Sequence, residues 1–520
     1  MTFEQNDVLF GHDPATGIVA VECDAEGATL YVREADGSTS SRRESFTPFL
    51  WTDSEVTSDD VATRRLGGDL TFRCITECSG GWRHFSRLRT SLKNTGVKSF
   101  SLGDPVQQFL LQTGKTLFKG MEFEELRRMQ LAIETHCADP DGVACAETPA
   151  DHLLSITMSD ASGWEQLLMI DPANPELSEL AALEDLTRTI GERDPDVIEG
   201  HDLFRVALPY LTARAKLRKT KLTWGRDQSV PRSRASRLQI AEKTINYPKF
   251  EVAGRHFVDT FLLAQFYDVS ARELEAFELA DVAGHFHFSS EGQIAIAGER
   301  QDAHLNEPEK FAAHARRTVA QIREVATTLS ASYFVQAKIF PYNYQDVVVR
   351  GNATKIDALL LREYYRRGHS IPDLPQARAF EGGYTDIFFS GIARDVAHCD
   401  VASLYPSVML RFDCFPVQDQ LGIFRGLLTD LRKFRLEAKS RLRDATGAER
   451  QYLNALQSTF KILINSFYGY LGFAQAHFAD FGAAARVTEI GRDLLKKMVA
   501  WLERQGAQVI EIDTDGIYFV

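Results

Sequence analysis

The stretch Val509-Ile-Glu-Ile512-Asp513-Thr514-Asp515-Gly516-Ile517-Tyr-Phe-Val520 places two aspartates between two runs of β-branched and aromatic residues. Such runs predict strands, and the short polar segment between them predicts a tight turn. The two carboxylates are therefore expected at the tip of a hairpin. A third aspartate, Asp400, lies near the end of another strand, predicted over residues 393–401.

Aspartates at strand ends suggest a particular chemistry. Transfer of a nucleotide from a nucleoside triphosphate uses two divalent cations, and carboxylates hold these cations beside the attacking and leaving oxygens. Asp400, Asp513 and Asp515 are the candidate carboxylates. A lone aspartate after a strand is more often a turn residue or a helix cap, so the interpretation depends on the residues that accompany these three.

Two predicted helices between these aspartates carry polar faces. In the helix over residues 451–471, steps of four, four and three place on one face Gln457, Lys461, Asn465 and Tyr468. The helix over residues 421–443 carries a basic face formed by Arg432, Arg435, Lys439 and Arg443. Such a face is usually only solvated, but beside an amide and an aromatic ring it suits a triphosphate and a base pair.

In this order, the segments resemble the three polymerase motifs of the family B DNA polymerases. Asp400-Val-Ala-Ser403-Leu404-Tyr405-Pro-Ser407 resembles motif A, residues 461–469 resemble motif B, and Asp513-Thr-Asp515-Gly516 resembles motif C. Motif C ends in Gly516 where many members have Ser. The chain looks like a bacterial-type member of the family that is truncated after motif C and has a degenerate 3′-5′ exonuclease domain.

The resemblance implies a role for each matching residue. Asp400, Asp513 and Asp515 would be catalytic, and with the Val401 carbonyl they would hold two Mg²⁺ ions, for which Mn²⁺ could substitute. The nucleotide-binding residues would be Ser403, Leu404, Tyr405, Arg435, Lys439, Lys461, Asn465 and Tyr468. Among them, Tyr405 would be the steric gate that excludes a ribose 2′-hydroxyl. Phe380-Glu-Gly382-Gly383 resembles the YxGG element of the family, so Gly382 and Gly383 are expected to contact the template.

Residues 126–300 resemble the exonuclease domain of the family, but two of its motifs have lost carboxylates. The first motif, Asp-x-Glu, appears as Ala132-Ile-Glu134. In the second motif, the family's Asn and Phe-Asp correspond to Asp202 and Val206-Ala207. The alanines remove two acids from the set that would hold metal ions.

The third exonuclease motif, Tyr-x-x-x-Asp, appears as Phe277-Glu-Leu-Ala-Asp281. Of the four acidic positions, only Glu134 and Asp281 then keep an acid. Two carboxylates cannot balance two cations or fix an attacking water, so exonuclease activity is predicted to be absent. Alanine is also what an experimenter would install to silence a nuclease, but the changes at Asp202 and Phe277 favour natural decay.

The predicted fold is multidomain, with α/β and α+β parts. A β-rich N-terminal domain (1–125) precedes an RNase H-like, exonuclease-like domain (126–300) and a helical connector (301–379). The remainder resembles a right-hand polymerase palm and helical fingers without a thumb: palm with motif A (380–427), fingers with motif B (428–475) and palm with motif C (476–520). Within the second domain, the pattern predicts a helix over 203–217 and a strand over 252–260.

With 44% hydrophobic and 25% charged residues, the chain has the composition of an ordinary folded protein. Its 520 residues are too many for a single hydrophobic core, so several domains are expected. No apolar run is long enough to span a membrane, and the seven cysteines include no CxxC pair. A cytoplasmic, nucleoid-associated location without a membrane partner is therefore expected. The net charge of -13 argues against binding of a nucleic acid, which is itself an anion. The basic runs at 214–226 and 432–443 nevertheless allow a basic groove within an acidic surface.

The predicted function is template-directed DNA polymerisation, in which deoxynucleotides are added to a primer 3′ end without proofreading. The expected partners are primer-template DNA, deoxynucleoside triphosphates, and a second chain or C-terminal segment that supplies further palm and a thumb. The alternatives are a non-catalytic DNA-binding scaffold, a fragment active only with a separate thumb segment, and a nuclease with a one-metal site. The intact Asp400, Lys461 and Asp515 argue against the scaffold. Replication, repair and lesion bypass stay open, and a lack of proofreading favours the latter two.

Overall fold

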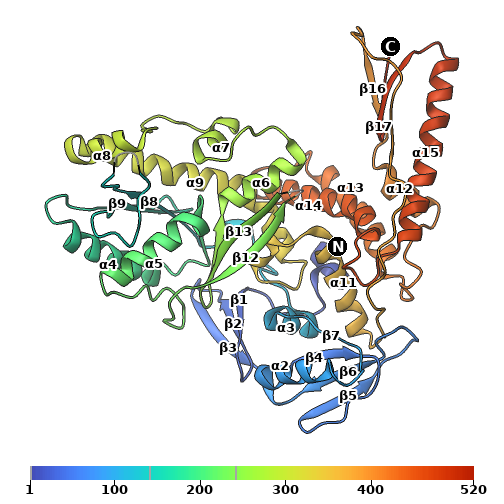
Figure 1. The fold of residues 1–520 in the computed structure, drawn as a ribbon, viewed down its shortest axis with the longest axis horizontal. Helices are drawn as coiled ribbons and strands as arrows, with labels where there is room; N and C mark the ends of the chain where they lie inside the picture. Colours follow the sequence, from blue (N-terminus) through green and yellow to red (C-terminus); the bar gives the residue numbers. More distant parts are fainter. Residues whose placement is uncertain (1–2, 140–141, 241–242) are drawn as a thin grey trace.

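The computed structural model describes residues 3–139, 142–240 and 243–520 as a mixed α/β chain of several packed units (Figure 1). The predicted multidomain α/β fold is thereby confirmed. In Figure 1 the N-terminal strands lie at the bottom in blue, and a five-stranded sheet lies at the left in teal. A small sheet near the C-terminus projects at the upper right beside the long helix α15 (Phe481–Arg504).

Two antiparallel sheets dominate the first 125 residues, as the β-rich pattern predicts. The three-stranded sheet has the order β1-β2-β3, with β1 (Ile18–Cys23), β2 (Ala28–Arg33) and β3 (Thr39–Glu44). The four-stranded sheet has the order β5-β6-β4-β7, with β4 (Phe49–Thr52), β5 (Val61–Arg65), β6 (Cys74–Cys78) and β7 (Ser99–Phe100). Three helices accompany them: α1 (Asp7–Phe10), α2 (Gly81–Leu92) and α3 (Pro105–Thr113).

The five-stranded sheet forms the core of the second unit. Its order is β10-β9-β8-β11-β14, with β8 (Arg128–Thr135), β9 (Leu153–Asp160), β10 (Glu165–Met169), β11 (Val197–Gly200) and β14 (His256–Asp259). β8, β11 and β14 run parallel, while β9 is antiparallel to both of its neighbours. The accompanying helices are α4 (Pro175–Arg193), α5 (Leu208–Leu217) and α6 (Thr260–Ala271).

Two predicted elements of this unit are wrong in their extent. The strand predicted over 252–260 begins only at His256, because the chain turns at Gly254, whose φ is +74°. The helix predicted over 203–217 begins with a wider π turn at Leu203–Ala207 and becomes α-helical from Leu208. A long hairpin of β12 (Arg232–Ile240) and β13 (Lys243–Glu251) was not predicted at all.

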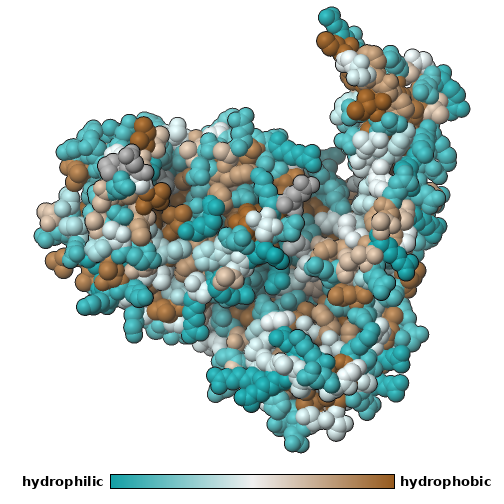
Figure 2. Space-filling model, in the orientation of Figure 1, coloured by the Kyte–Doolittle hydropathy of each residue, from teal (hydrophilic) through white to brown (hydrophobic). Residues whose placement is uncertain are grey.

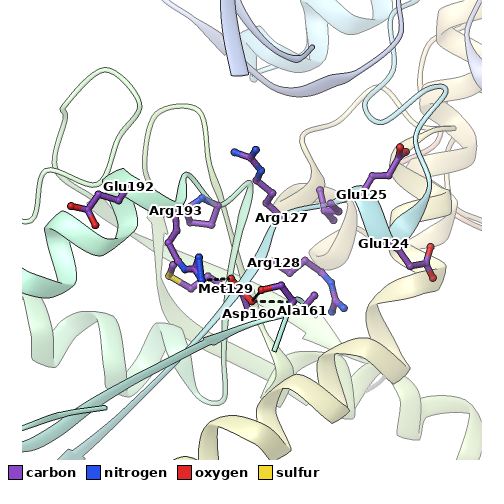
Figure 3. Close-up of a pocket in the computed structure, with 12 residues that line it drawn as sticks. Glu124, Glu125, Arg127, Arg128, Met129, Asp160, Ala161, Glu192 and Arg193 are labelled. Carbon is purple, nitrogen blue, oxygen red and sulfur yellow. Dashed lines mark hydrogen bonds and ion pairs between the residues drawn. The ribbon is translucent and has the colours of Figure 1, made fainter. Parts of the chain in front are cut away.

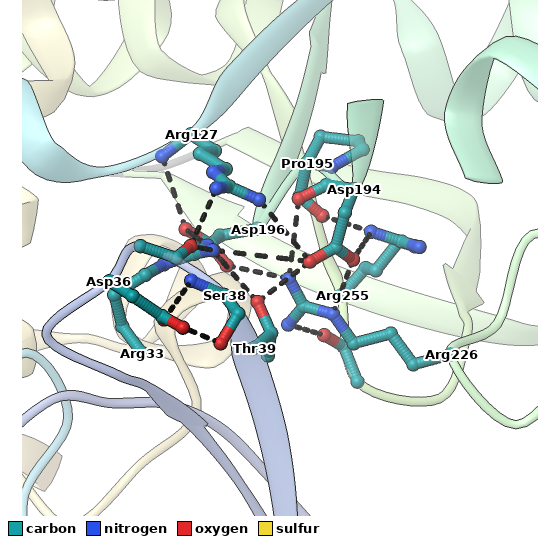
Figure 4. A network of polar contacts seen from close by, with 12 residues as sticks. Arg33, Asp36, Ser38, Thr39, Arg127, Asp194, Pro195, Asp196, Arg226 and Arg255 are labelled. Carbon is teal, nitrogen blue, oxygen red and sulfur yellow. Dashed lines mark hydrogen bonds and ion pairs between the residues drawn. The ribbon is translucent and has the colours of Figure 1, made fainter. Parts of the chain in front are cut away.

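A buried ionic network joins the N-terminal sheet to the second unit (Figure 4). Asp196 is fully buried and accepts hydrogen bonds from Arg33 at 2.7 Å and Arg226 at 2.7 Å. Asp194 accepts from Arg226 and Arg255, each at 2.8 Å. Burial and the neighbouring Arg226 lower the pKa of Arg255 to about 10, so the network holds an excess of positive charge.

A long helix connects three parts of the molecule. The helices that follow the sheet are α7 (Leu279–His285), α8 (Ala297–Asn306), α9 (Pro308–Ala337), α10 (Tyr344–Val349) and α11 (Asn352–Arg366). α9 packs on β8, β9 and β10 along much of its length. Near its end, Phe334 stacks on Phe118 with ring centroids 5.0 Å apart. The Thr459 hydroxyl of a later helix donates to the Ser332 carbonyl at 3.1 Å.

The C-terminal part combines a four-stranded antiparallel sheet, called the C-terminal sheet below, with four helices. Its order is β15-β17-β18-β16, with β15 (Tyr384–Ile387), β16 (Ala397–Asp400), β17 (Val509–Thr514) and β18 (Gly516–Phe519). The helices are α12 (Leu404–Arg411), α13 (Ile423–Arg441), α14 (Gly447–Leu471) and α15. The predicted long helices are confirmed to within a few residues. The strand predicted over 393–401 is wrong in extent, because Asp395 adopts a left-handed φ of 57° and the strand begins at Ala397.

The edge strands β15 and β16 of the C-terminal sheet and the loop between them are open to solvent, whereas Ile512 and Ile517 of the central strands are buried. All four residues of β16 are exposed, and Ile387 and Ile392 are 66% and 92% exposed. Figure 2 shows apolar surface, in brown, at this end of the molecule. No helix in the described part of the chain is long and apolar enough to cross a membrane.

Candidate active site

Strand register brings two of the predicted aspartates together. In the C-terminal sheet, Asp513 of β17 and Asp400 of β16 both pair with Gly516 of β18. Asp515 lies in the turn between β17 and β18, as predicted, and its carbonyl accepts the Val401 N–H at 2.9 Å. The β16 end and the hairpin tip are therefore adjacent, and Asp400 and Asp515 line one pocket.

The electrostatics of this hairpin suit a cation. Burial and the neighbouring carboxylates of Asp400 and Asp513 raise the pKa of Asp515 above its usual value. Among residues 3–139, 142–240 and 243–520, no three His, Cys, Asp or Glu side chains converge as metal ligands. Asp400, Asp513 and Asp515 therefore do not form a three-carboxylate metal site in this structure.

A pocket of about 630 Å³ connects these carboxylates to the predicted basic faces. On its acidic side it is lined by Asp400, Asp515 and the start of α12 at Ser403, Leu404 and Tyr405. Its opposite side is formed by residues of α13 and α14, namely Arg432, Arg435, Leu436, Lys439, Lys461, Ile464 and Asn465. The structure therefore gathers most of the predicted nucleotide-binding residues around one cavity.

The basic side of the pocket has capacity for an anion. The Arg435 Nε is buried and has no hydrogen-bond partner within the described residues, and an unpaired buried donor is costly. No ion pair is found for Arg435, Lys439 or Lys461 in the described part of the chain. A phosphate group in this pocket would provide the missing acceptors.

Tyr405 and Tyr468 meet at the edge of this pocket. Their ring centroids lie 4.3 Å apart at 34°. Burial, Tyr468 and Asp515 raise the pKa of Tyr405 to about 12, so its hydroxyl is neutral at physiological pH. Tyr468, which was predicted to bind the nucleotide, does not line the pocket itself and contacts it through the Tyr405 ring.

The predicted template-contact element lies behind Tyr405. A Cβ atom added to Gly383 would lie 2.7 Å from the Tyr405 hydroxyl, which explains the need for glycine at this close approach. The carbonyls of Glu381 and Gly382 accept hydrogen bonds from Arg492 of α15. Sequence reasoning missed Arg492 because it carries no motif signal.

At the second predicted site, cationic and apolar side chains surround the first motif. Glu134 forms an ion pair with Arg300 of α8 at 3.1 Å and accepts a hydrogen bond from Nε2 of the buried His314 of α9 at 3.1 Å. Ala132 is 7% exposed and packs against Val319 and Ile322 of α9. The place beside Glu134 is thus filled by protein groups.

The remaining predicted residues of this site do not converge on Glu134. The Asp202 carboxylate forms an ion pair with Arg205 at 2.7 Å, and Ala207 is buried in the core of this unit. Phe277 and Asp281 lie just before and within α7, where Asp281 is exposed. Within the described residues, no hydrogen bond or ion pair joins Asp281 to Glu134.

The helix that faces β8 is α9, and its early turns contain Phe311-Ala-Ala-His314-Ala315. Phe311 and Ala315 have the spacing of Tyr and Asp in the third motif, Tyr-x-x-x-Asp. Alanine therefore stands where the motif has its acid. The contact of α9 with β8 brings this segment beside the first motif.

Comparison with known proteins finds two matching family models. Residues 414–515 match the model of the DNA polymerase family B, and residues 124–274 match the model of its exonuclease domain. A DNA polymerase of Archaeoglobus fulgidus is 28% identical over 426 residues, which are 76% of this chain and 50% of the relative. The chain is related to the family B DNA polymerases.

Further relatives support this relationship. DNA polymerase 1 of Pyrococcus abyssi is 26% identical over 79% of this chain and 56% of its own length. The solved family B DNA polymerase of Pyrobaculum calidifontis shares the fold, with a TM-score of 0.76, 18% identity, and coverage of 96% of this chain and 73% of that one. The chain spans about half the length of the curated family B polymerases that it matches. The bacterial type and the truncation stay predictions.

One departure from the family B motifs has a structural reason. Many family members have Ser where this chain has Gly516. A Cβ atom at this position would lie 2.6 Å from Nε2 of His398, whose ring stacks on Tyr518 at 4.2 Å. The His398 ring occupies the space of the missing side chain, and Asp513 and Asp515 keep their places in the hairpin.

A second pocket, of about 450 Å³, lies elsewhere in the exonuclease-like unit (Figure 3). It is formed at the start of β8, the β9–β10 turn and the end of α4, where Arg193 points toward Asp160 at 3.4 Å. Acidic and basic side chains are mixed around it. It contains none of the residues predicted for polymerisation or nuclease chemistry in family B polymerases.

Proposed function

We propose that this chain catalyses template-directed DNA synthesis, adding deoxynucleotides to a primer 3′ end. The observation that carries the proposal is the pocket in which Asp400 and Asp515 face the cationic side chains of α13 and α14. A nucleoside triphosphate presents phosphates to such cations while its reacting phosphorus stays near the carboxylates. The relationship to family B polymerases gives the same reaction class.

Each side of the pocket has its own role in this proposal. Arg435, Lys439 and Lys461 bind the triphosphate, and α13 and α14 act as the fingers that carry them. Tyr405 lies under the sugar as the steric gate against a 2′-hydroxyl. Asn465 and Tyr468 line the nascent base pair, and the C-terminal sheet is the palm.

Divalent cations complete the site. Asp400, Asp515 and the Val401 carbonyl would hold Mg²⁺ together with substrate phosphates, and Asp513 lies beside them. Bound Mg²⁺ would favour ionisation of the primer 3′-hydroxyl and offset charge on the phosphates. The protein positions the hydroxyl and the α-phosphate for displacement of pyrophosphate.

Primer extension tests the role of the basic face. In the complete polypeptide with Mg²⁺ and a 5′-labelled primer-template, Lys461→Ala is expected to lower kcat/KM for the deoxynucleotide about tenfold or more, because a charge-assisted contact to phosphate is lost. The matched control is Lys433→Ala, since Lys433 is exposed on α13 outside the pocket. An equal effect in both variants would contradict the proposed phosphate contact. Absence of extension by the unchanged protein would favour the scaffold.

We further propose that the exonuclease-like domain does not proofread. Arg300 forms an ion pair with Glu134, and His314 donates a hydrogen bond from Nε2 to the same carboxylate, which would otherwise be free to hold a metal ion. Ala132 and Ala207 remove two further acids, and Ala315 of α9 stands at the acidic position of a third motif. A nuclease site needs several carboxylates to hold its cations, and of the predicted exonuclease residues that the structure describes, Glu134 is the one carboxylate on β8.

Restoring the two lost aspartates is expected not to restore nuclease activity. In Ala132→Asp/Ala207→Asp, the new carboxylates would be buried beside apolar side chains, and burial of an unpaired charge is costly. The double variant should therefore show no primer shortening in a nucleotide-free reaction and a lower unfolding temperature. If the double variant shortens the primer in the presence of Mg²⁺, natural loss of the two aspartates is contradicted. Deliberate replacement at positions 132 and 207 is then favoured. Adding Arg300→Ala tests whether this cation alone blocks the site.

A further inference from the structure

One face of α15 carries three residues that lie outside the predicted site. These are Thr488, Gly491 and Arg492. Gly491 and Arg492 follow Thr488 by three and four residues, so all three lie on one side of the helix. Thr488 and Gly491 are buried, and the Arg492 side chain is only 13% exposed. This face is turned toward α12 and the C-terminal sheet.

Thr488 and Arg492 hold the backbone of the predicted template-contact element. The Arg492 guanidinium donates to the Gly382 carbonyl at 2.7 Å and to the Glu381 carbonyl at 3.0 Å. The Thr488 hydroxyl donates to the same Glu381 carbonyl at 2.7 Å. Both of these hydrogen bonds from Arg492 come from Nη1, and its Nη2 forms an ion pair with the Glu381 carboxylate at 3.2 Å, so one guanidinium contacts three oxygens of the element.

Gly491 holds the Tyr405 ring from the same helix. A Cβ atom at Gly491 would lie 3.3 Å from Cε1 of Tyr405, so the ring rests directly on the α15 backbone. The hydroxyl of this ring lies against Gly383, and the ring stacks on Tyr468. Tyr405 is therefore confined by α15, by the template-contact element and by α14.

We propose that Thr488, Gly491 and Arg492 form a positioning clamp that fixes the Glu381–Gly383 backbone against the Tyr405 ring. The inference rests on the proposed polymerase function. A steric gate excludes a 2′-hydroxyl only while its ring cannot retreat, and the clamp removes the space into which the ring could move. Discrimination between deoxyribose and ribose thus depends on α15 residues that do not touch the nucleotide.

The test compares incorporation of dCTP and CTP opposite the same template base by the complete polypeptide. In Arg492→Gln, loss of the charged fork should raise the ratio of CTP to dCTP in kcat/KM by about tenfold. Arg492→Lys, which keeps the charge and one donor, should recover part of this discrimination. Gly491→Ala should raise KM for dCTP about tenfold with little change in kcat, because the added methyl pushes the ring into the sugar site.

Matched controls separate positioning from general stability. Lys497→Gln removes an exposed charge from the same helix, and Gly191→Ala adds a methyl to a helical glycine that has open space around it. Neither should change the ratio. If Arg492→Gln unfolds at assay temperature, Arg492→Lys and Thr488→Val provide the same readout.

The outcomes distinguish this inference from the proposed function. Efficient dCTP incorporation with a ratio within about twofold of the unchanged protein in the Arg492 and Thr488 variants would overturn the clamp alone. An equal shift in Lys497→Gln would also overturn it. No extension by the unchanged protein would overturn the proposed function and the clamp together.

Discussion

Asp515→Ala is expected to abolish primer extension, lowering kcat/KM by about a thousandfold or more. Asp515 lies at the hairpin tip, and its pKa is raised first by burial and then by the neighbouring carboxylates of Asp400 and Asp513, whose charge bound cations would offset. Metal-ion stabilisation of a phosphoryl-transfer transition state is worth several kcal/mol, and each 1.36 kcal/mol changes a rate tenfold. The measurement is single-nucleotide incorporation by the complete polypeptide at saturating Mg²⁺.

The control for this substitution is Asp493→Ala, because Asp493 is exposed on α15 and no ion pair is found for it in the described part of the chain. The control should extend primers at the unchanged rate. Unaltered circular dichroism of Asp515→Ala would show that the loss is chemical. Retention of more than a few per cent of activity would falsify the assignment of Asp515 as a metal ligand.

Asp196→Ala is expected to destabilise the contact between the N-terminal sheet and the exonuclease-like unit by about 3–5 kcal/mol. Asp196 is fully buried, and its removal leaves Arg33 and Arg226 with Asp194 as their remaining acidic neighbour (Figure 4). The lowered pKa of Arg255 shows that positive charge is already crowded there. Differential scanning calorimetry should show an unfolding temperature lower by about 10 °C.

Asp185→Ala gives the matched comparison on the surface. Asp185 pairs with Arg188 on α4 at 2.8 Å, but both side chains are about half exposed. Exposed pairs of this kind contribute about 0–1 kcal/mol, so the unfolding temperature should hardly change. Similar shifts in the two variants would show that the buried network does not join the two units.

The local sequence was sufficient to predict the elements that depend on residues close together in the chain. The hairpin at Asp515 follows from strand formers on both sides of a polar turn, and the long helices follow from apolar periodicity. The position of Asp400 beside this hairpin could not be predicted in the same way, because its pairing with Gly516 joins segments more than 100 residues apart. The similarity to family B polymerases supports the predicted polymerase function. The role of each site residue stays a prediction.

Long-range packing accounts for what the sequence reading missed. The β12–β13 hairpin carries its stabilising contacts between strands rather than in a periodic pattern, and Asp395 delays the start of β16 through a backbone angle that composition does not specify. Arg492 and Thr488 act on carbonyls more than 100 residues away. The likeness of the Phe311–Ala315 segment to the third exonuclease motif gains weight only from the contact of α9 with β8.

The helix α9 gives the exonuclease-like domain a role that does not depend on nuclease chemistry. Its His314 reaches Glu134, its Phe334 stacks on Phe118 near the N-terminal sheet, and its Ser332 carbonyl accepts a hydrogen bond from Thr459 of α14. Substitutions at Ala132 and Ala207 would leave these three contacts intact, whereas deletion of the domain would remove a support of the helix that carries Lys461. Under the proposal that the domain does not proofread, selection would tolerate drift in its acidic positions while it preserves the faces of α9, and the domain would persist as scaffolding for a neighbouring reaction.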